Sequence, residues 1–287
     1  MKANRHPLGA SHPALLGVMG LFLVWTAFPL LWVLYSSLKT DTAILEQPFA
    51  PPGIDRQPEW SNYDETWHDE GFSTYFANSV VVVGTSVFFI LVLSAPAAYA
   101  LSRFAHPLGP PLLWLFLAGM MIPIQLSVVP LFFQLRDWNL LHSRTGLILV
   151  YTASGLPFGV FILSGFFRTL PRSLYEAAIL DGCGNGTAFW RVMLPLARPG
   201  LITVAIMQFI ILWKEFFFAF MFLSGDRADT VSTLALGLAG LAVTSQYRTD
   251  YGILFAGLAI VTLPLLAVYI LLQKHLVKGV ASGAVKG

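Results

Sequence analysis

Six long apolar stretches dominate this sequence and restrict the chain to structures that can exist in a lipid bilayer. They cover residues 14–38, 77–101, 111–134, 146–167, 201–223 and 252–273. A helix needs roughly 20 apolar residues to cross about 30 Å of hydrocarbon. Inside lipid, backbone N–H and C=O groups have to be satisfied within the protein, which favours helices. The sequence therefore predicts an all-α, polytopic membrane protein in which six transmembrane helices form a single domain over residues 1–287.

Composition agrees with a lipid environment. Only 11% of the 287 residues are charged and 56% are hydrophobic, whereas soluble chains carry roughly 25% charged residues. The formal net charge of +2 is small and the basic residues are spread out, which argues against a nucleic-acid partner. The first apolar stretch follows Lys2 and Arg5, as in a signal peptide, but it is too long and lacks a small-residue cleavage site. We therefore expect an uncleaved first span.

The distribution of Lys and Arg predicts the orientation. The N-terminus, the 102–110 turn, the 168–200 loop and the C-terminus together hold ten basic residues and two acidic ones. The opposite segments hold six basic and twelve acidic residues. Since cytoplasmic loops carry an excess of Lys and Arg, both termini and the 168–200 loop should face the cytoplasm. The outer segment 39–76 begins as a proline-rich connection and predicts a short helix from Ser61 to Asp69; a solvated linker is favoured there over a docking surface.

The loop between spans four and five predicts two short helices joined by a hinge. Ser173 and Glu176 have the spacing of a capping box at the start of the first helix. Three glycines should end that helix and permit positive φ: Gly182, Gly184 and Gly186. Asn185 or Thr187 is expected to cap the second helix, which should end before Pro195. Its apolar side chains Phe189, Trp190, Val192 and Met193 form a face that requires a partner.

At these residues the chain resembles a known family. Glu176-Ala-Ala, then Asp181-Gly182 and then Leu194-Pro195 match the EAA loop of the inner-membrane permeases of ABC importers. Other stretches resemble the carbohydrate-importing, maltose-type branch: Asn62-Tyr63, Phe76-Ala-Asn78-Ser79, Ala95-Pro-Ala-Ala-Tyr-Ala100, Met121-Ile-Pro123, Leu156-Pro157-Phe158, Gly165-Phe-Phe167 and the tail from Lys278 to Gly287. The resemblance runs from about residue 14 to the last residue.

The resemblance implies a coupling role for this loop, which in the family is a helix seated in a cleft of a separate ATP-hydrolysing subunit. Carried over, the coupling contacts would be Glu176, Ala177, Ala178, Asp181, Gly182, Leu194 and Pro195. Glu176 is expected both to complete its capping box and to pair with a basic residue of the ATPase. The tail resembles the segment that reaches between ATPase subunits, the alternative being a frayed terminus; it comprises Gly283, Ala284, Val285, Lys286 and Gly287.

The same resemblance implies the assembly: two permease subunits, an ABC ATPase dimer and an extracytoplasmic solute-binding protein in the cell inner membrane. The chain would be a transport subunit and no enzyme, with ATP and Mg²⁺ bound by the partner ATPase and no cofactor of its own. The solute would be carbohydrate-like. The sequence leaves open whether the second permease is identical or a homologue, and which solute is carried.

Lys214 and Glu215 are the charged residues inside a predicted span, and such residues usually face a cavity or a partner. Neighbours on a helix diverge by about 100°, so one would face the translocation path and the other a companion helix. An Asn is usual in the family where Lys214 stands. The alternative is that Lys214 snorkels to the outer interface and Glu215 makes a structural pair.

Polar residues in two spans are further candidates for the path. Pro123, Gln125 and Pro130 should break span three, and Gln125 is expected to satisfy a freed carbonyl or, as the sharper hypothesis, to line a cavity. Gln208 in span five faces the same choice.

Two other functions fit the sequence less well. A secondary transporter would need internal acids and commonly an internal repeat, but the spans hold one acid, Glu215, and no obvious repeat. A membrane-embedded enzyme would need a catalytic or metal motif, and the sequence has no H-E-x-x-H and no Gly-x-x-x-x-Gly-Lys-Ser/Thr loop. The lone cysteine, Cys183, predicts an inert residue, and no metal site is expected.

Overall fold

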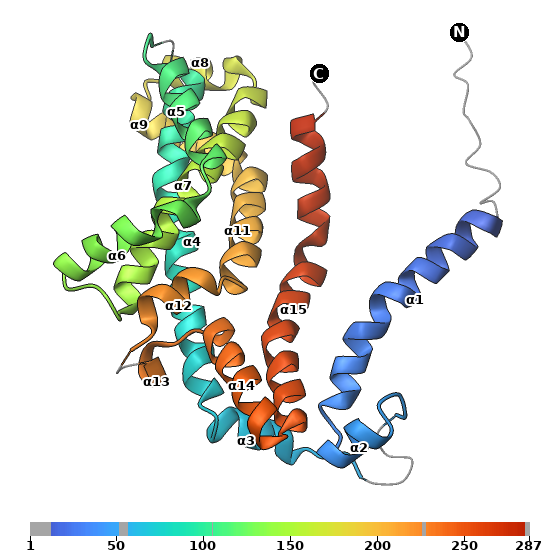
Figure 1. The fold of residues 1–287 in the computed structure, drawn as a ribbon. Coiled ribbons are helices and arrows are strands. Elements are labelled where there is room, and N and C mark those ends of the chain that lie inside the picture. Colours follow the sequence, from blue (N-terminus) through green and yellow to red (C-terminus); the bar gives the residue numbers. More distant parts are fainter. Residues whose placement is uncertain (1–12, 52–56, 105, 226–227, 285–287) are drawn as a thin grey trace. The chain divides into compact units, whose positions relative to one another are not determined.

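The computed structural model describes residues 13–51, 57–104, 106–225 and 228–284, and over these ranges it contains helices and no strand (Figure 1). The predicted all-helical, polytopic fold is confirmed. Four helices are long and apolar enough to cross a membrane, and two bent helix pairs bring the number to as many as six. The chain divides into two compact units, residues 1–70 with 241–260 and residues 71–240 with 261–287. Each unit is described by itself.

The first unit contains α1 (Pro13–Ser36), α2 (Asp41–Glu46) and α3 (Ser61–His68). The short helix expected from Ser61 is therefore present. Asn62 of α3 donates to the carbonyls of Ser37 and Lys39 at 2.9 Å each. The backbone N–H of Gly252 donates to Asp41 Oδ1 at 2.8 Å. These hydrogen bonds join α3 to residues 37–39 and α2 to Gly252, so these described residues form more than a solvated linker.

Lys39 lies at the centre of this outer unit. Its side chain is buried, and Nζ donates to the carbonyl oxygens of Gln47 at 2.8 Å and Pro48 at 3.3 Å. No carboxylate lies within salt-bridge distance of it among the described residues. The groups that face the Lys39 amine are these carbonyl oxygens and the ring of Tyr35, whose centroid lies 5.1 Å from Nζ. Burial lowers the pKa of Lys39 below its ordinary value.

The core of the second unit is a pair of long helices, α4 (Phe72–Arg103) and α7 (Arg144–Thr169). They lie side by side in Figure 1, with α11 (Arg198–Trp213) packed against both. Gly155 and Gly159 of α7 permit the close approach: a Cβ at Gly159 would lie 2.8 Å from Ser94 Oγ of α4. Both long helices extend a few residues beyond the predicted apolar stretches. In α4 the helix continues through residues 72–76 and 102–103.

Span three is bent, as its prolines predicted. It consists of α5 (Gly109–Met121), the 3₁₀ turn η1 (Ile124–Ser127) and α6 (Val128–Asp137), and the two halves make an angle of 87°. Ile122 and Pro123 have extended ψ values of 120° and 113°. The residue before a proline avoids helical dihedrals, which explains the break. Pro130 lies within α6 and does not interrupt it, since a first-turn residue needs no intrahelical N–H bond.

The interpretation of span five as one helix is wrong. α11 ends at Trp213, residues 214–216 are non-helical, and α12 (Phe217–Leu223) begins a new helix. The expected 100° divergence of Lys214 and Glu215 therefore does not apply. The reason is local competition: the Glu215 carboxylate accepts the backbone N–H groups of Phe218 and Ala219 and thereby starts α12.

The segment between spans five and six contains two helices that sequence reasoning missed, α13 (Ala228–Val231) and α14 (Leu234–Arg248). The apolar run from Leu234 to Val243 is the signal that was available for α14. Asn78 of α4 holds the turn between them, donating to the carbonyls of Thr230 and Ser232 at 3.0 Å each. The last helix, α15 (Tyr251–Ala284), runs well past the predicted end of span six.

Candidate functional site

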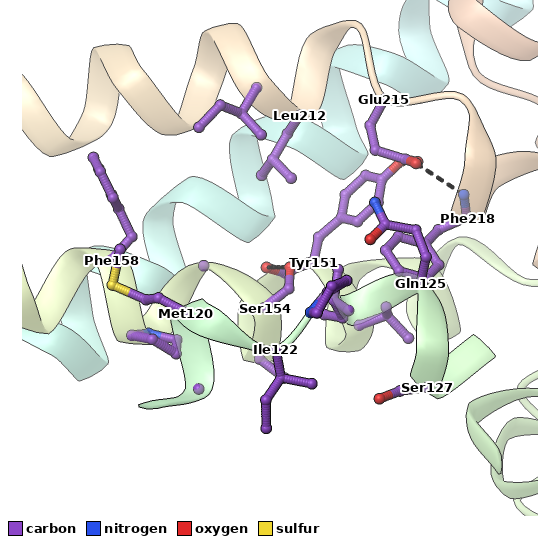
Figure 2. A pocket seen from close by; sticks show the side chains of 18 of the residues that line it. Met120, Ile122, Gln125, Ser127, Tyr151, Ser154, Phe158, Leu212, Glu215 and Phe218 are labelled. Atoms are coloured by element: carbon purple, nitrogen blue, oxygen red, sulfur yellow. Dashed lines mark hydrogen bonds between the residues drawn. The ribbon is translucent and has the colours of Figure 1, made fainter. Parts of the chain in front are cut away.

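A cavity of about 700 Å³ opens where the broken spans three and five meet α7. Most of its lining is apolar, and Figure 2 shows the polar side chains that point toward it. Three of the four predicted path residues line it, namely Gln125, Gln208 and Glu215. Lys214 is exposed and is not among the lining residues. The breaks in both spans therefore place polar groups on one cavity wall.

Glu215 is the best-anchored of these residues. Its Oε1 accepts the Phe218 N–H at 2.8 Å, and its Oε2 accepts the Ala219 N–H at 3.2 Å and the Tyr151 hydroxyl at 2.5 Å. The dashed line in Figure 2 marks the first of these bonds. All three bonds are accepted by the carboxyl oxygens of this one side chain. Tyr151, which is not among the predicted path residues, fixes Glu215 to α7.

The two glutamines have different surroundings. Gln208 is only 3% exposed, and its Nε2 donates to the Gly155 carbonyl at 3.2 Å, joining α11 to α7. Gln125 is exposed, and its side chain makes no hydrogen bond within the described part of the chain. The expectation that Gln125 satisfies a freed backbone carbonyl is therefore wrong. Its amide, with two donor hydrogens and one acceptor oxygen, remains available to a molecule in the cavity.

The loop between spans four and five has the two predicted helices, but with different ends. α8 (Arg172–Leu180) starts at Arg172 with Pro171 before it, and no side chain caps it. The capping box of Ser173 and Glu176 is therefore wrong, because Ser173 lies inside the first turn and not at the cap. Gly182 has φ +85°, as expected for the hinge. Among the other two glycines, Gly184 precedes the next helix and Gly186 lies within it.

The second helix of this loop continues past its expected end. It comprises α9 (Asn185–Ala188), the π-helical turn η2 (Phe189–Met193) and α10 (Leu194–Leu196), so Pro195 lies inside it. A proline in an α-helix clashes with the carbonyl four residues earlier. The wider π turn, in which the Leu194 N–H donates to the Phe189 carbonyl, makes room for Pro195. The expected caps are also wrong, since Asn185 accepts the Tyr175 hydroxyl at 2.8 Å and caps nothing.

Half of the apolar face of this second helix packs against the chain itself. Phe189 and Met193 are buried, and the Phe189 ring lies 5.0 Å from that of Tyr99 in α4. Tyr99 also contacts Phe167 at the end of α7, at 5.4 Å. The expectation that the whole face needs an external partner is thus wrong for these residues. The aromatic cluster instead joins the loop to the ends of α4 and α7.

Arg103 makes a second connection between this loop and α4. Its guanidinium donates to the carbonyls of Leu170 at 3.4 Å and Pro171 at 3.0 Å, directly before α8. It also lies 5.9 Å from the Tyr175 ring of α8. Charge-assisted hydrogen bonds thus join the residues directly before α8 to the end of α4.

The remaining surface of α8 is exposed. Glu176, Ala177, Asp181, Gly182 and Pro195 are exposed, Leu194 is half-buried, and Ala178 is 6% exposed. Leu180 is 87% exposed, and Leu174, Ile179 and Trp190 are also exposed.

In the tail, Gly283 and Ala284 belong to the helix α15, and Val285, Lys286 and Gly287 lie outside the described residues. No group of three metal-binding side chains occurs among the residues described.

Apolar helices long enough to span a membrane and a cavity at the breaks of two of them are features of a membrane transport protein. A family match covers residues 90–282. The chain belongs to this family, the binding-protein-dependent transport system inner membrane component, and is thus a multi-pass protein of the inner membrane.

Individual relatives of the chain are also named as transport system permeases. The chain is 42% identical over 266 residues to the diacetylchitobiose uptake system permease protein NgcG of Streptomyces coelicolor, covering 92% of this chain and 86% of the relative. It is 32% identical over 281 residues to the trehalose transport system permease protein SugB of Mycobacterium tuberculosis, covering 98% and 100%. A crystal structure of a bacterial ABC transporter that imports alginate matches with a TM-score of 0.78 and 22% identity, over 93% of this chain and 99% of the other. This likeness supports the fold.

Proposed function

We propose that this chain forms half of the translocation pathway of an ATP-driven importer for a carbohydrate-like solute, coupled to a separate ATPase through α8. The observation that carries the proposal is the exposed apolar and acidic surface of α8, on a loop whose other face is buried against α4 and α7. Such a surface in an aqueous compartment favours a protein partner. Orientation by the Lys and Arg distribution puts this surface in the cytoplasm.

The relatives support the solute class. Their names refer to diacetylchitobiose, to trehalose, and, for MelC of Bacillus subtilis, to melibiose, raffinose and stachyose. In the cavity, Gln125 offers an amide that can donate to and accept from sugar hydroxyls. Glu215, fixed by three hydrogen bonds, shapes the wall next to it, and Gln208 holds α11 to α7. Lys214 is exposed at the same break in span five and would meet the solute only outside this cavity.

The coupling contact would use the exposed positions Glu176, Ala177, Asp181, Gly182 and Pro195, with half-buried Leu194 at its edge. Ala178, which faces the chain's own interior, would hold α8 in place. The end of α15 and the residues beyond it would reach the ATPase dimer, where ATP and Mg²⁺ are bound. A second permease subunit and an extracytoplasmic binding protein complete the proposed assembly.

Cysteine crosslinking tests the coupling contact. In a Cys183→Ser background, Ala177→Cys should crosslink to cysteines scanned over the ATPase, in an ATP-sensitive manner. The neighbouring Ala178→Cys is the matched control, because its side chain is buried, and it should react poorly. Absence of any crosslink from Ala177→Cys and Leu180→Cys in a folded chain would show that α8 is not the contact with the ATPase.

Solute uptake tests the cavity. Gln125→Ala should reduce uptake of a radiolabelled disaccharide about tenfold, because a lost pair of hydrogen bonds is worth roughly 1–3 kcal/mol. Leu126→Ala is the control: Leu126 is exposed next to Gln125 but does not line the cavity. Equal uptake by the two variants would remove Gln125 from the path.

A further inference from the structure

A second cavity, of about 800 Å³, lies away from the first, where three helices end. α4 ends at Arg103, α5 begins at Gly109 and α7 ends at Thr169, and all three contribute to its lining. These are the ends at which the spans leave the hydrocarbon on the side assigned to the cytoplasm. On that orientation the outer end of the cavity lies at the level of the lipid headgroups.

The cavity is polar at one end and apolar at the other. Arg168, next to the end of α7, and His106, in the turn before α5, form its outer end. Leu117 lies eight residues into α5, and Phe161 eight residues before the end of α7. At 1.5 Å per residue these side chains are about 12 Å deeper. The polarity thus changes with depth as it does along a phospholipid, from charged headgroup to acyl chain.

Arg168 supplies a cation that the chain itself does not use. Its side chain is exposed and makes no hydrogen bond or ion pair with any residue that the structure describes. Arg103, at the end of α4, by contrast donates its hydrogen bonds to the carbonyls of Leu170 and Pro171. His106 Nδ1 accepts the Leu108 N–H at 3.2 Å, so in the neutral ring Nε2 carries the hydrogen and is a donor.

Trp114 marks the depth of the headgroup region. It lines the cavity, is 70% exposed, and lies five residues into α5, about 8 Å below its start. Tryptophan is enriched at this level of a membrane because its ring is apolar and its N–H is polar. Exposed apolar side chains of the cavity, Phe104 and Phe161 among them, continue this lipid-compatible surface.

From this arrangement we infer that the cavity is a binding site for an anionic phospholipid of the cytoplasmic leaflet. The lipid phosphate binds Arg168 and the His106 Nε2–H, and one acyl chain lies against Leu113, Leu117 and Phe161. Basic pockets between transmembrane helices on the cytoplasmic side bind anionic headgroups in this way. A free sugar would not suit the deep end, which offers no hydrogen-bonding side chain.

The site has a further implication for α8, since Arg168 is four residues before Arg172, where α8 begins. A lipid held at Arg168 fixes the end of α7 from which the loop departs. The inference rests on the cytoplasmic orientation given above. It does not depend on the ATPase contact, so failure of the crosslinking experiment would leave it standing.

The test is lipid retention by the full chain, purified in detergent and, separately, within the assembled importer, measured by native mass spectrometry. Dioleoyl phosphatidylglycerol is the probe, and dioleoyl phosphatidylcholine is the zwitterionic comparison. Wild type should retain phosphatidylglycerol preferentially. Arg168→Gln should weaken retention about fivefold, the effect of roughly 1 kcal/mol for one basic residue at an anionic surface. Arg168→Lys should keep most of it, and Arg198→Gln, an exposed arginine on the same side that does not line the cavity, should keep all of it.

A second pair of variants tests the acyl-chain end without changing charge. Leu117→Trp should fill the deep end and reduce retention, whereas Leu115→Trp, exposed and outside the lining, should not. Inorganic phosphate should not displace the lipid. The inference would be overturned by equal retention of the two lipids, by an Arg168→Gln variant that behaves like Arg198→Gln, or by displacement with phosphate alone, which would indicate a site for a soluble anion.

Discussion

The Tyr151 hydroxyl of α7 donates to Glu215 Oε2 at 2.5 Å, across the break between α11 and α12. The same carboxylate accepts the first free N–H groups of α12. One side chain therefore starts a helix and also anchors it to a neighbouring span. Glu215 supports the broken form of span five, since without its carboxylate the N–H groups of Phe218 and Ala219 would lack these acceptors.

Tyr151→Phe should destabilise the purified permease by about 1–3 kcal/mol, because Glu215 Oε2 loses a donor in a partly buried site. Thermal unfolding in detergent measures this as a lower Tm. Tyr269→Phe is the control, since Tyr269 is half exposed and no hydrogen bond of its hydroxyl is found among the described residues. If both variants had the Tm of wild type, the hydrogen bond would contribute nothing to stability.

Gly159→Ala should destabilise the packing of α4 against α7 by about 1–3 kcal/mol through overpacking. The added methyl would lie 2.8 Å from Ser94 Oγ and 2.9 Å from Ser94 Cβ. Gly165→Ala, on the same helix with no atom within 4 Å of its Cβ, should be neutral or slightly stabilising. A Tm difference between the two variants is the expected result, and equal values would contradict the close approach.

Arg103→Gln should loosen the start of α8, because the carbonyls of Leu170 and Pro171 lose their charged donor. Hydrogen exchange of the α8 amides should become about tenfold faster if the free energy of opening α8 falls by about 1.4 kcal/mol. Arg191→Gln serves as the comparison, since Arg191 is exposed in the same loop and makes no hydrogen bond to the described residues. Exchange rates unchanged in Arg103→Gln would show that α8 is held by its apolar contacts alone.

Lys39 should make the stability of the outer unit depend on pH. Burial lowers its pKa below the ordinary value of 10.5, so the unfolded chain binds this proton more tightly than the folded one. The free energy of unfolding therefore rises with pH between the lowered pKa and 10.5, relative to a variant without the amine. The Tm difference between wild type and Lys39→Met should shift in favour of wild type as the pH increases through that window. Lys274→Met, which removes an exposed amine, should show a constant difference.

The spans were predictable because apolar length is a property of each segment alone. The bend in span three was likewise predictable from Pro123, since a proline restricts the backbone of the residue directly before it. The break in span five was not predictable in this way: hydropathy treats residues 201–223 as one stretch. The hydrogen bond that fixes Glu215 to α7 comes from Tyr151, 64 residues earlier in the chain.

In the loop between spans four and five, the features set by local residue types were likewise predictable, and those set by distant contacts were not. Its two helices and the positive φ of Gly182 follow from local residue types. The capping box failed because α8 begins at Arg172, two residues too early for Ser173 to cap it. Burial of Phe189 and Met193 depends on Tyr99 and other distant aromatic residues, which no periodicity within the loop reveals.

The break at residues 214–216 also constrains the order in which the chain can enter the membrane during synthesis. A charged residue at the centre of a helix raises the free energy of insertion by roughly 2.5–3.5 kcal/mol on translocon scales. Tyr151 precedes Glu215 in the chain, so α7 is synthesised first and offers its hydroxyl when Glu215 arrives. We therefore expect insertion of span five to depend on the earlier insertion of α7, so that Tyr151→Phe should lower the amount of correctly inserted permease.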